Sequence, residues 1–291
     1  MRRFANKLAA SALVAAVAGL CLSWAAGSAM VAGRASAIPP AAPPALDFRM
    51  REPDGIGLGA TYWPGRKPAA PAILLLHGVG ASRAATAPNA AWLAGLGYAV
   101  LTIDFRGHGQ STLVERTMGL TEARDVKAAF VWLKRRQRGA PIAVIGISLG
   151  GAAALLGAEG PVPANALVLQ AVYPDIRHAI RNRIAVRLGS APAWLLEPLL
   201  SYQSLPRFGA WPSELAPATA LKRFRGPTLI IGGEHDRSTP PAETRAMFAA
   251  ARGPKTLWLK PEGDHPDICD ARDDAYRLHV RAFLERTIGP A

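Results

Sequence analysis

The stretch GISLG at residues 146–150 places Ser148 between two glycines, directly after the apolar run PIAVI. A serine held on a sharp turn between a strand and a helix exposes its hydroxyl, which can then act as a nucleophile in acyl transfer. Glycines are needed on both sides because larger residues would collide across so tight a turn. The G-x-S-x-G pattern alone is weakly specific, so the surrounding elements have to support this chemistry.

A serine nucleophile needs a base, and the chain has six histidines, at positions 77, 108, 178, 235, 265 and 279. His265 lies in the loop PEGDHPD after the last apolar strand, at the sheet edge where open α/β folds bind ligands. The base needs a carboxylate that fixes its tautomer, and the loop GGEHDRSTP after the preceding strand offers Asp236. We therefore expect Ser148 as nucleophile, His265 as base and Asp236 as orienting acid.

Other polar side chains near these positions have simpler interpretations. Glu234 lies closer to its strand and is expected to make a structural contact, and Asp264 adjoins the histidine, where neighbouring loop side chains rarely face each other. His77 is expected to shape the loop in which it lies. Asp104, Arg106 and His108 are expected to fix the loop that follows their strand by hydrogen bonding. The remaining histidines fall in predicted helices (positions 178 and 279) or directly after a strand (position 235).

The elements that must position these residues alternate between apolar strands and amphipathic helices. Strands are predicted at residues 72–78, 99–105, 141–147, 165–174, 227–233 and 255–261, and helices at 121–137, 241–251 and 273–288. Strands that are apolar throughout, separated by helices, predict a mostly parallel sheet with helices on both faces. Two further strands are expected around a turn within residues 46–65.

Residues 175–225 break this alternation and are expected to form a small lid inserted between two core strands. A predicted helix at 175–188 carries Ile176, Ile180, Ile184 and Leu188 at steps of four. We expect this stripe to lie over an acyl pocket, with Trp194 and Trp211 adding apolar wall; the alternative is that the helix packs on the core and its arginines are solvated.

Five segments in this order are similar to motifs of the α/β-hydrolases: LLLHGVG, DFRGHGQS, GISLGG, TLIIGGEHDRSTP and PEGDHPD. The resemblance covers roughly residues 47–290, and the later part most resembles bacterial serine-aminopeptidase-like and dienelactone-hydrolase-like enzymes. It implies an α/β-hydrolase fold with a small inserted lid and the family's chain order of serine, acid and histidine. It also implies an oxyanion hole formed by the backbone N–H groups of Val79 and Leu149.

The N-terminus precedes the hydrolase-like domain. Arg2, Arg3 and Lys7 lead into an uncharged run at residues 8–33, followed by the small-x-small site Ala35-Ser36-Ala37. Residues 1–37 are therefore expected to be a signal peptide or, because about 20 apolar residues cross a bilayer, an uncleaved membrane anchor. A Pro-rich linker follows at 38–46, and the domain occupies 47–291. Both alternatives predict export, to the periplasm or beyond, with membrane association through residues 8–33 in the second.

Composition restricts the other partners. The net charge of the chain is +13, of which the first 37 residues contribute four, leaving +9 for the rest. No nucleic-acid motif accompanies this charge, so we expect a solvated basic surface and no nucleic-acid partner. Cleavage would leave Cys269 as the only cysteine, and no zinc-binding spacing is present. We expect no metal and no cofactor, while the oligomeric state stays open.

These observations favour a serine hydrolase that cleaves an ester or small amide through an acyl-enzyme on Ser148. Two alternatives remain at this stage. The same triad serves cofactor-free perhydrolases and haloperoxidase-like enzymes, and a hydrolase scaffold can carry a non-catalytic binding protein.

Overall fold

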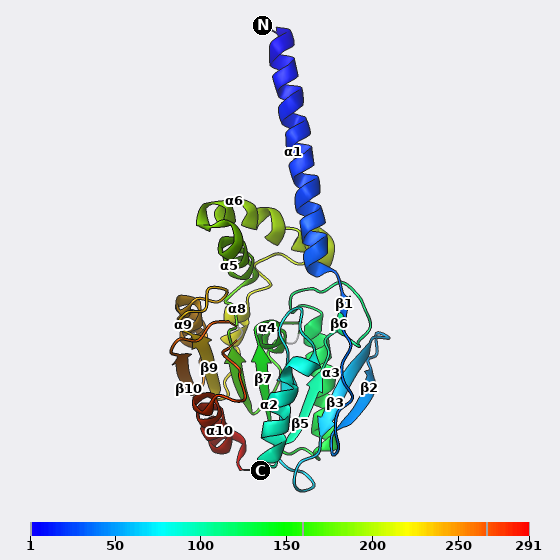
Figure 1. Cartoon of the computed structure of the whole chain (residues 1–291), viewed down its shortest axis with the longest axis vertical. Coiled ribbons are helices and arrows are strands. Elements are labelled where there is room, and N and C mark those ends of the chain that lie inside the picture. The colour runs from blue at the N-terminus through cyan, green and yellow to red at the C-terminus, as the bar shows by residue number, and fades with distance from the viewer. Residues whose placement is uncertain (1, 159, 266, 291) are drawn as a thin grey trace.

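The computed structural model describes residues 2–158, 160–265 and 267–290, and its centre is one eight-stranded sheet (Figure 1). The strand order is β10-β9-β8-β7-β4-β5-β3-β2, and neighbouring strands from β10 to β5 are parallel, whereas β3 and β2 pair antiparallel. The strands are β2 (Leu46–Arg51), β3 (Gly57–Trp63), β4 (Ala72–Leu76), β5 (Ala99–Ile103), β7 (Ile142–Ile147), β8 (Ala166–Gln170), β9 (Thr228–Gly233) and β10 (Lys255–Lys260). The expected mostly parallel sheet is confirmed.

Helices cover both faces of this sheet, and the strand side chains alternate between them. Ile73 and Leu75 of β4 pack with α2 (Arg83–Gly95) and α10 (Asp274–Ile288). Leu74 and Leu76 belong to the opposite cluster, whose helices include α3 (Glu122–Arg136), α4 (Leu149–Leu155), the start of α5 (Ile176–Leu188), α8 (Pro217–Leu221) and α9 (Pro241–Ala250). These four side chains are at most 2% exposed. Burying each one contributes roughly 1.5–3 kcal/mol, which explains why the strands have no polar face.

The segment between β8 and β9 folds into α5 (Ile176–Leu188), α6 (Ser190–Ser201), α7 (Ser204–Phe208) and α8. Because α5 begins a few residues after the carboxyl end of β8, this lid lies at the carboxyl edge of the sheet, at the top of the domain in Figure 1. Ile176 and Ile180 are buried, but Leu188 is 60% exposed. The expected stripe is therefore packed only along its first part.

The expectation that Trp194 and Trp211 wall an apolar pocket is wrong, because their exposed fractions are 64% and 51%. Trp194 lies on α6, and Trp211 lies in the segment between α7 and α8. Sequence spacing identified apolar residues in this segment but did not indicate which of them face solvent.

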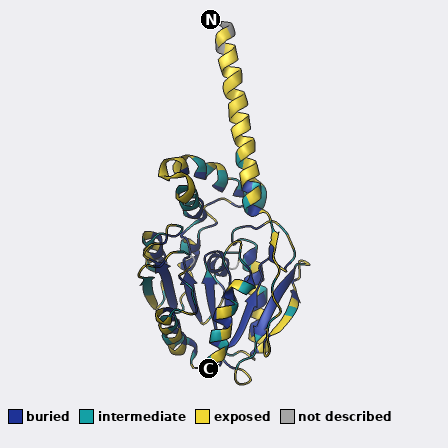
Figure 2. Cartoon of the chain, in the orientation of Figure 1, coloured by how far each residue is buried: buried dark blue, intermediate teal, exposed yellow. Residues whose placement is uncertain are grey.

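The chain begins with α1 (Arg2–Val31), a helix that rises away from the domain and is exposed over most of its length (Figure 2). Within it, residues Asn6–Val31 are long and apolar enough to cross a membrane, with a mean hydropathy of 2.0. The helix is followed by β1 (Arg34–Ala35), which pairs in parallel with β6 (His108–Gly109). Since β6 follows the carboxyl end of β5, α1 joins the domain at the same sheet edge as the lid.

Candidate active site

Ser148 stands between the end of β7 and the start of α4, with φ 49° and ψ −110°. This conformation is strained for any residue other than glycine and is typical of a nucleophile on a strand-to-helix turn. A Cβ atom on Gly146 would collide with the backbone of Gly151, and one on Gly150 with the backbone of Leu76. The two glycines are therefore required by space, as the sequence pattern predicts.

Asp236 and His265 meet at the same edge of the sheet. The Nδ1 atom of His265 lies 2.8 Å from Oδ2 of Asp236, whose carboxylate is fully buried. The other oxygen, Oδ1, accepts hydrogen bonds from the backbone N–H groups of Ser238 and Thr239, both at 2.8 Å. The two backbone bonds fix the carboxylate, so Oδ2 is the oxygen left to face the imidazole. With Nδ1 donating to Asp236, the Nε2 atom of His265 is free to accept a proton.

Backbone contacts between the loops after β9 and β10 bring these two residues together. The N–H of Glu234 donates to the carbonyl of Lys260, at 3.1 Å, and the N–H of His235 donates to the carbonyl of Gly263, at 3.0 Å. Both bonds follow from the parallel pairing of β9 with β10, which aligns the ends of the two strands.

The hydroxyl of Ser148 is buried and makes no hydrogen bond within the described residues. The structure thus pairs the expected acid and base, but it does not join Ser148 Oγ to His265. A buried hydroxyl without a partner is unusual and calls for an explanation. Hydrogen bonds between catalytic groups are often long without substrate and shorten in the Michaelis complex.

His77 fixes the loop that begins after β4. Its Nε2 atom accepts the N–H of Phe105, at 3.1 Å, and its Nδ1 atom donates to the carbonyl of Gly78, at 2.8 Å. Burial lowers the pKa of His77 to about 3, with His108 nearby adding to the effect, so the ring is neutral at physiological pH. Because C=O and N–H of a trans peptide point in opposite directions, the N–H of Val79 is directed away from His77.

The backbone of this loop also approaches Ser148. A Cβ atom built on Gly78 would lie 3.7 Å from the Cβ of Ser148, in ordinary contact. Leu149 is the first residue of α4, and the first N–H groups of a helix have no partner inside it. Of the two residues expected to bind an oxyanion, Leu149 follows Ser148 in the chain, and Val79 follows Gly78, whose backbone lies near Ser148.

The loop after β5 is held by buried charges. Asp104 pairs with Arg83, and its Oδ2 atom accepts the N–H of Gln110 at 3.0 Å. Arg106 bonds to Asp125 at 2.6 Å and to Glu52 at 3.0 Å. Asp104 and Arg106 therefore fix this loop by hydrogen bonding, as the sequence predicts.

The other histidines have partners outside the Asp236–His265 pair. His178 bonds to Asp175 at 2.8 Å, and His279 stacks on Trp258. His235 pairs with Glu262 at the surface, at 3.3 Å. Glu234 is exposed.

Sequence reasoning missed the residues that hold the acid loop. The amides of Ser238 and Thr239 orient Asp236, and an Asp followed by Ser and Thr two and three positions later is a recognisable Asx-turn pattern. Asn182 of α5 donates to the carbonyl of Ser238, at 3.2 Å, and to Glu243, at 2.6 Å. The bond to Ser238 ties the lid to the acid loop, the bond to Glu243 ties the lid to α9, and no local sequence pattern predicts either contact.

Comparison with known sequences places this geometry in context. Residues 67–207 match the model of the family "Serine aminopeptidase, S33". The Bacillus subtilis protein YqkD is 30% identical over 196 residues, which cover 65% of this chain and 63% of that protein, or less than two thirds of its length. The Mycobacterium tuberculosis protein Rv2307c is 31% identical over 256 residues, covering 84% of this chain and 81% of that protein.

Solved structures share the fold at lower identity. An esterase of Pyrococcus furiosus superposes with a TM-score of 0.72 at 21% identity, covering 89% of this chain and 99% of its own. An esterase of Exiguobacterium antarcticum gives a TM-score of 0.59 at 17% identity, covering 82% and 99%. At such identities the likeness establishes the fold alone.

Proposed function

Because this chain belongs to the serine aminopeptidase (S33) family of α/β-hydrolases, we propose that it is a serine hydrolase that cleaves carboxylic esters through an acyl-enzyme on Ser148. The observation that carries the proposal is the hydrogen bond between His265 and Asp236 at the sheet edge where Ser148 stands on its strained turn. The esterases among the structural neighbours favour an ester as substrate.

In the proposed reaction, Ser148 Oγ attacks the substrate carbonyl while the free Nε2 of His265 takes the hydroxyl proton. Asp236 keeps the imidazole in the tautomer that has Nε2 unprotonated, and it stabilises the imidazolium that forms. The N–H groups of Val79 and Leu149 donate to the developing oxyanion. His265 then gives its proton to the leaving oxygen.

Water completes the cycle by the same route. His265 takes a proton from the water that attacks the acyl-enzyme, and Ser148 leaves as the hydroxyl. Helix α4 begins directly after Ser148, and the positive end of its dipole is at that N-terminus. This end stabilises the negative charge on the tetrahedral intermediate in both acylation and deacylation.

Hydrolysis of an aminoacyl amide is a second candidate, because the matching family model is that of a serine aminopeptidase. The two activities differ in the leaving group that His265 must protonate. A panel of p-nitrophenyl esters of increasing acyl length, assayed beside aminoacyl amides, separates them by kcat/KM.

The test of the mechanism is Ser148→Ala. Removing a nucleophile that acts as a unit with its base costs on the order of 10⁶ in kcat. The matched control is Ser204→Ala, which also removes a buried hydroxyl without a hydrogen-bond partner in the described structure. We expect a fluorophosphonate probe to label wild type and the control but not Ser148→Ala. Labelling or near-normal turnover of Ser148→Ala in the folded state would refute the proposal.

A further inference from the structure

Helix α6 is folded with its charge inward and its apolar side chains outward. The only charged residue of the helix, Glu197, is fully buried and accepts hydrogen bonds from Arg177 and Arg181 of α5, at 2.9 and 3.1 Å. The opposite side carries Leu195, which is 74% exposed. Trp194, which is 64% exposed, lies at the edge of that side, where Arg181 stacks on its ring. A helix on the surface of a soluble domain has the reverse arrangement, so this face is built to meet an apolar partner.

The exposed apolar side chains of α6 and of its C-terminal end form one surface, which we call the α6 face. Its residues are Trp194, Leu195, Leu199 and Tyr202. The α6 face continues onto α1. The hydroxyl of Ser23 donates to the carbonyl of Leu199, at 2.8 Å, and Gln203 donates to the carbonyl of Ser23, at 3.0 Å. Figure 1 shows α6 beside the lower part of α1, at the top of the domain.

The last turns of α1 are built into the lid. The guanidinium of Arg207 stacks on the Trp24 ring at 3.9 Å, and it donates to the Ser28 hydroxyl at 2.8 Å. Gly27 lies so close to Gln203 that a Cβ there would collide with its side chain, and Val31 is only 6% exposed.

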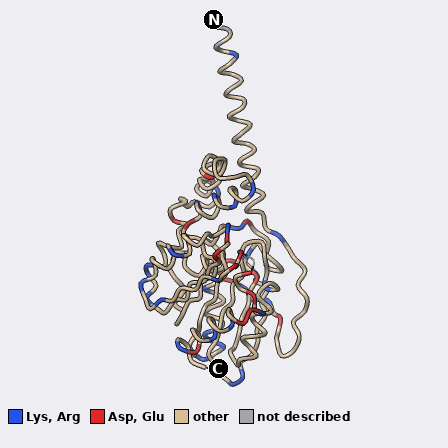
Figure 3. The backbone as a smooth tube through the Cα atoms, turned by 60° about the vertical axis from the view of Figure 1, so that its left-hand side comes forward, with Lys and Arg blue, Asp and Glu red and all other residues tan. Residues whose placement is uncertain are grey.

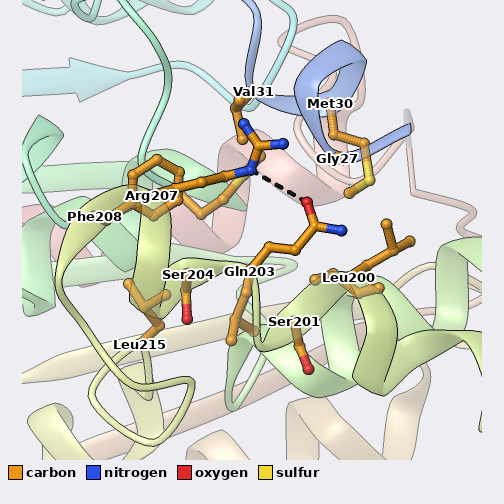
Figure 4. Close-up of a pocket in the computed structure, with 13 residues that line it drawn as sticks. Gly27, Met30, Val31, Leu200, Ser201, Gln203, Ser204, Arg207, Phe208 and Leu215 are labelled. Atoms are coloured by element: carbon orange, nitrogen blue, oxygen red, sulfur yellow. Dashed lines mark hydrogen bonds between the residues drawn. The ribbon is translucent and has the colours of Figure 1, made fainter. Parts of the chain in front are cut away.

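The remaining space in this contact is small. Between α1 and the lid there is a cavity of about 30 Å³, lined by Gly27, Met30 and Val31 on one side and by Leu200 and Phe208 among others on the other (Figure 4). It has room for no more than one or two water molecules, so the surfaces are packed together. Cleavage before Ile38 would remove one whole side of this interface and uncover Arg207, whose side chain is now 6% exposed.

The length of α1 that extends beyond the lid determines where a membrane surface would lie along the helix. Beyond the lid contact at Ser23, the uncharged residues 8–22 form 15 residues of helix, or about 23 Å at 1.5 Å per residue. A bilayer has a hydrocarbon core about 30 Å thick. Because this length is shorter than the core, a membrane crossed by α1 has its surface at Ser23 and Trp24 or further toward the domain, beside the α6 face.

The aromatic and charged residues of α1 and the lid are distributed as expected for a membrane surface near Trp24. Trp24 with its stacked Arg207 falls at the boundary, where tryptophan rings and long basic side chains are favoured. Arg181 stacks on Trp194 at 3.7 Å, on the border of the α6 face. Figure 3 shows α1 without charge between its N-terminal end and the lid. The basic residues Arg2, Arg3 and Lys7 at that end orient it toward the cytoplasm.

We propose that α1 is retained as a membrane anchor and that the α6 face lies in the surface of the phospholipid bilayer beside it. The lid is then an interfacial element, held at the lipid surface by α1. This inference concerns how the domain sits on the membrane and does not depend on the chemistry proposed for Ser148.

The test places a polarity-sensitive dye on the α6 face in the full-length chain. Leu195→Cys carries the dye in a Cys21→Ser background, and Leu278→Cys is the matched control. Leu278 is 68% exposed on α10, at the end of the domain away from α1 (Figure 1). Cys269 can stay, because burial raises its thiol pKa to about 11 and suppresses labelling. Both proteins are reconstituted into vesicles of phosphatidylcholine and phosphatidylglycerol, with and without a spin-labelled lipid.

We expect a blue shift of the dye at position 195 and loss of most of its emission with the spin-labelled lipid, and neither change at position 278. Emission like that of the control at position 195 would overturn the proposal. A blue shift that the spin-labelled lipid does not quench would also overturn it, and would indicate a protein partner such as a second copy of this chain. Mass spectrometry of the membrane fraction gives an independent result, because a mature N-terminus at Ile38 would exclude a retained anchor.

Discussion

Asp236 and His265 are 29 residues apart in the sequence, and their side chains meet at 2.8 Å with the carboxylate fully buried. Two backbone N–H groups hold the second carboxylate oxygen, so the acid has one way to face the imidazole. This arrangement determines what each substitution at the site should do.

Asp236→Asn should lower kcat about 10⁴-fold, because Asp236 is the acid that orients the imidazole of His265. The asparagine keeps its oxygen toward the N–H groups of Ser238 and Thr239 and turns its NH₂ toward His265. That orientation forces the imidazole proton onto Nε2, the atom that must accept the serine proton. Measured with a p-nitrophenyl ester, His265→Ala should cost at least as much. Glu234→Gln, an exposed acid two residues away, is the control, and activity lost there but kept in Asp236→Asn would show that the wrong acid was assigned.

His77 should make the folded state sensitive to mild acid. Its pKa is about 3 in the folded protein, against 6.5 in the unfolded chain, so between these values only the unfolded state binds the proton. The free energy of unfolding is therefore highest above pH 6.5 and falls as the pH drops below that value. At pH 5 this one group lowers it by about 2 kcal/mol. The measurement is the urea midpoint at pH 8 and pH 5, followed by tryptophan fluorescence.

His77→Asn should be less stable than wild type at pH 8, because the acceptor for the Phe105 N–H is disturbed. The variant should also lose this part of the pH dependence. His235→Asn removes a histidine that is 58% exposed at its side chain and should keep the wild-type profile. An unchanged slope between pH 5 and pH 8 in His77→Asn would mean that His77 is not held neutral by burial.

Arg106→Met should destabilise the fold by about 3–5 kcal/mol, because it leaves the buried carboxylates of Asp125 and Glu52 without their counter-charge. Arg124→Met is the control, since Arg124 lies 3.9 Å from Asp54 and is 67% exposed; its loss should cost no more than about 1 kcal/mol. Unfolding by urea at pH 7 compares the two variants. Similar midpoints would indicate that water reaches the Arg106 cluster and screens it.

Local patterns in the sequence were sufficient for the sheet and for the strand-to-helix turn that carries Ser148. Uninterrupted apolar runs such as residues 72–76 specify strands buried on both faces, and the two glycines around Ser148 specify a turn that no larger residue fits. Chain order and parallel pairing then bring the ends of β9 and β10 together, so the meeting of Asp236 with His265 was within reach of the sequence.

Only the tertiary structure shows which faces of the lid helices are buried and which residues α1 contacts. Spacing along α5 and α6 indicates apolar positions, but a periodic pattern does not state which face is covered. The outcome depends on long-range pairs: Arg177 and Arg181 draw Glu197 inward, and the apolar side of α6 is left outward. In the same way, the uncharged run at the N-terminus fits a signal peptide and an anchor equally well by composition. Its packing against Gln203 and Arg207, about 180 residues away in the chain, is a contact that composition does not predict, because only a folded lid presents those side chains to the helix.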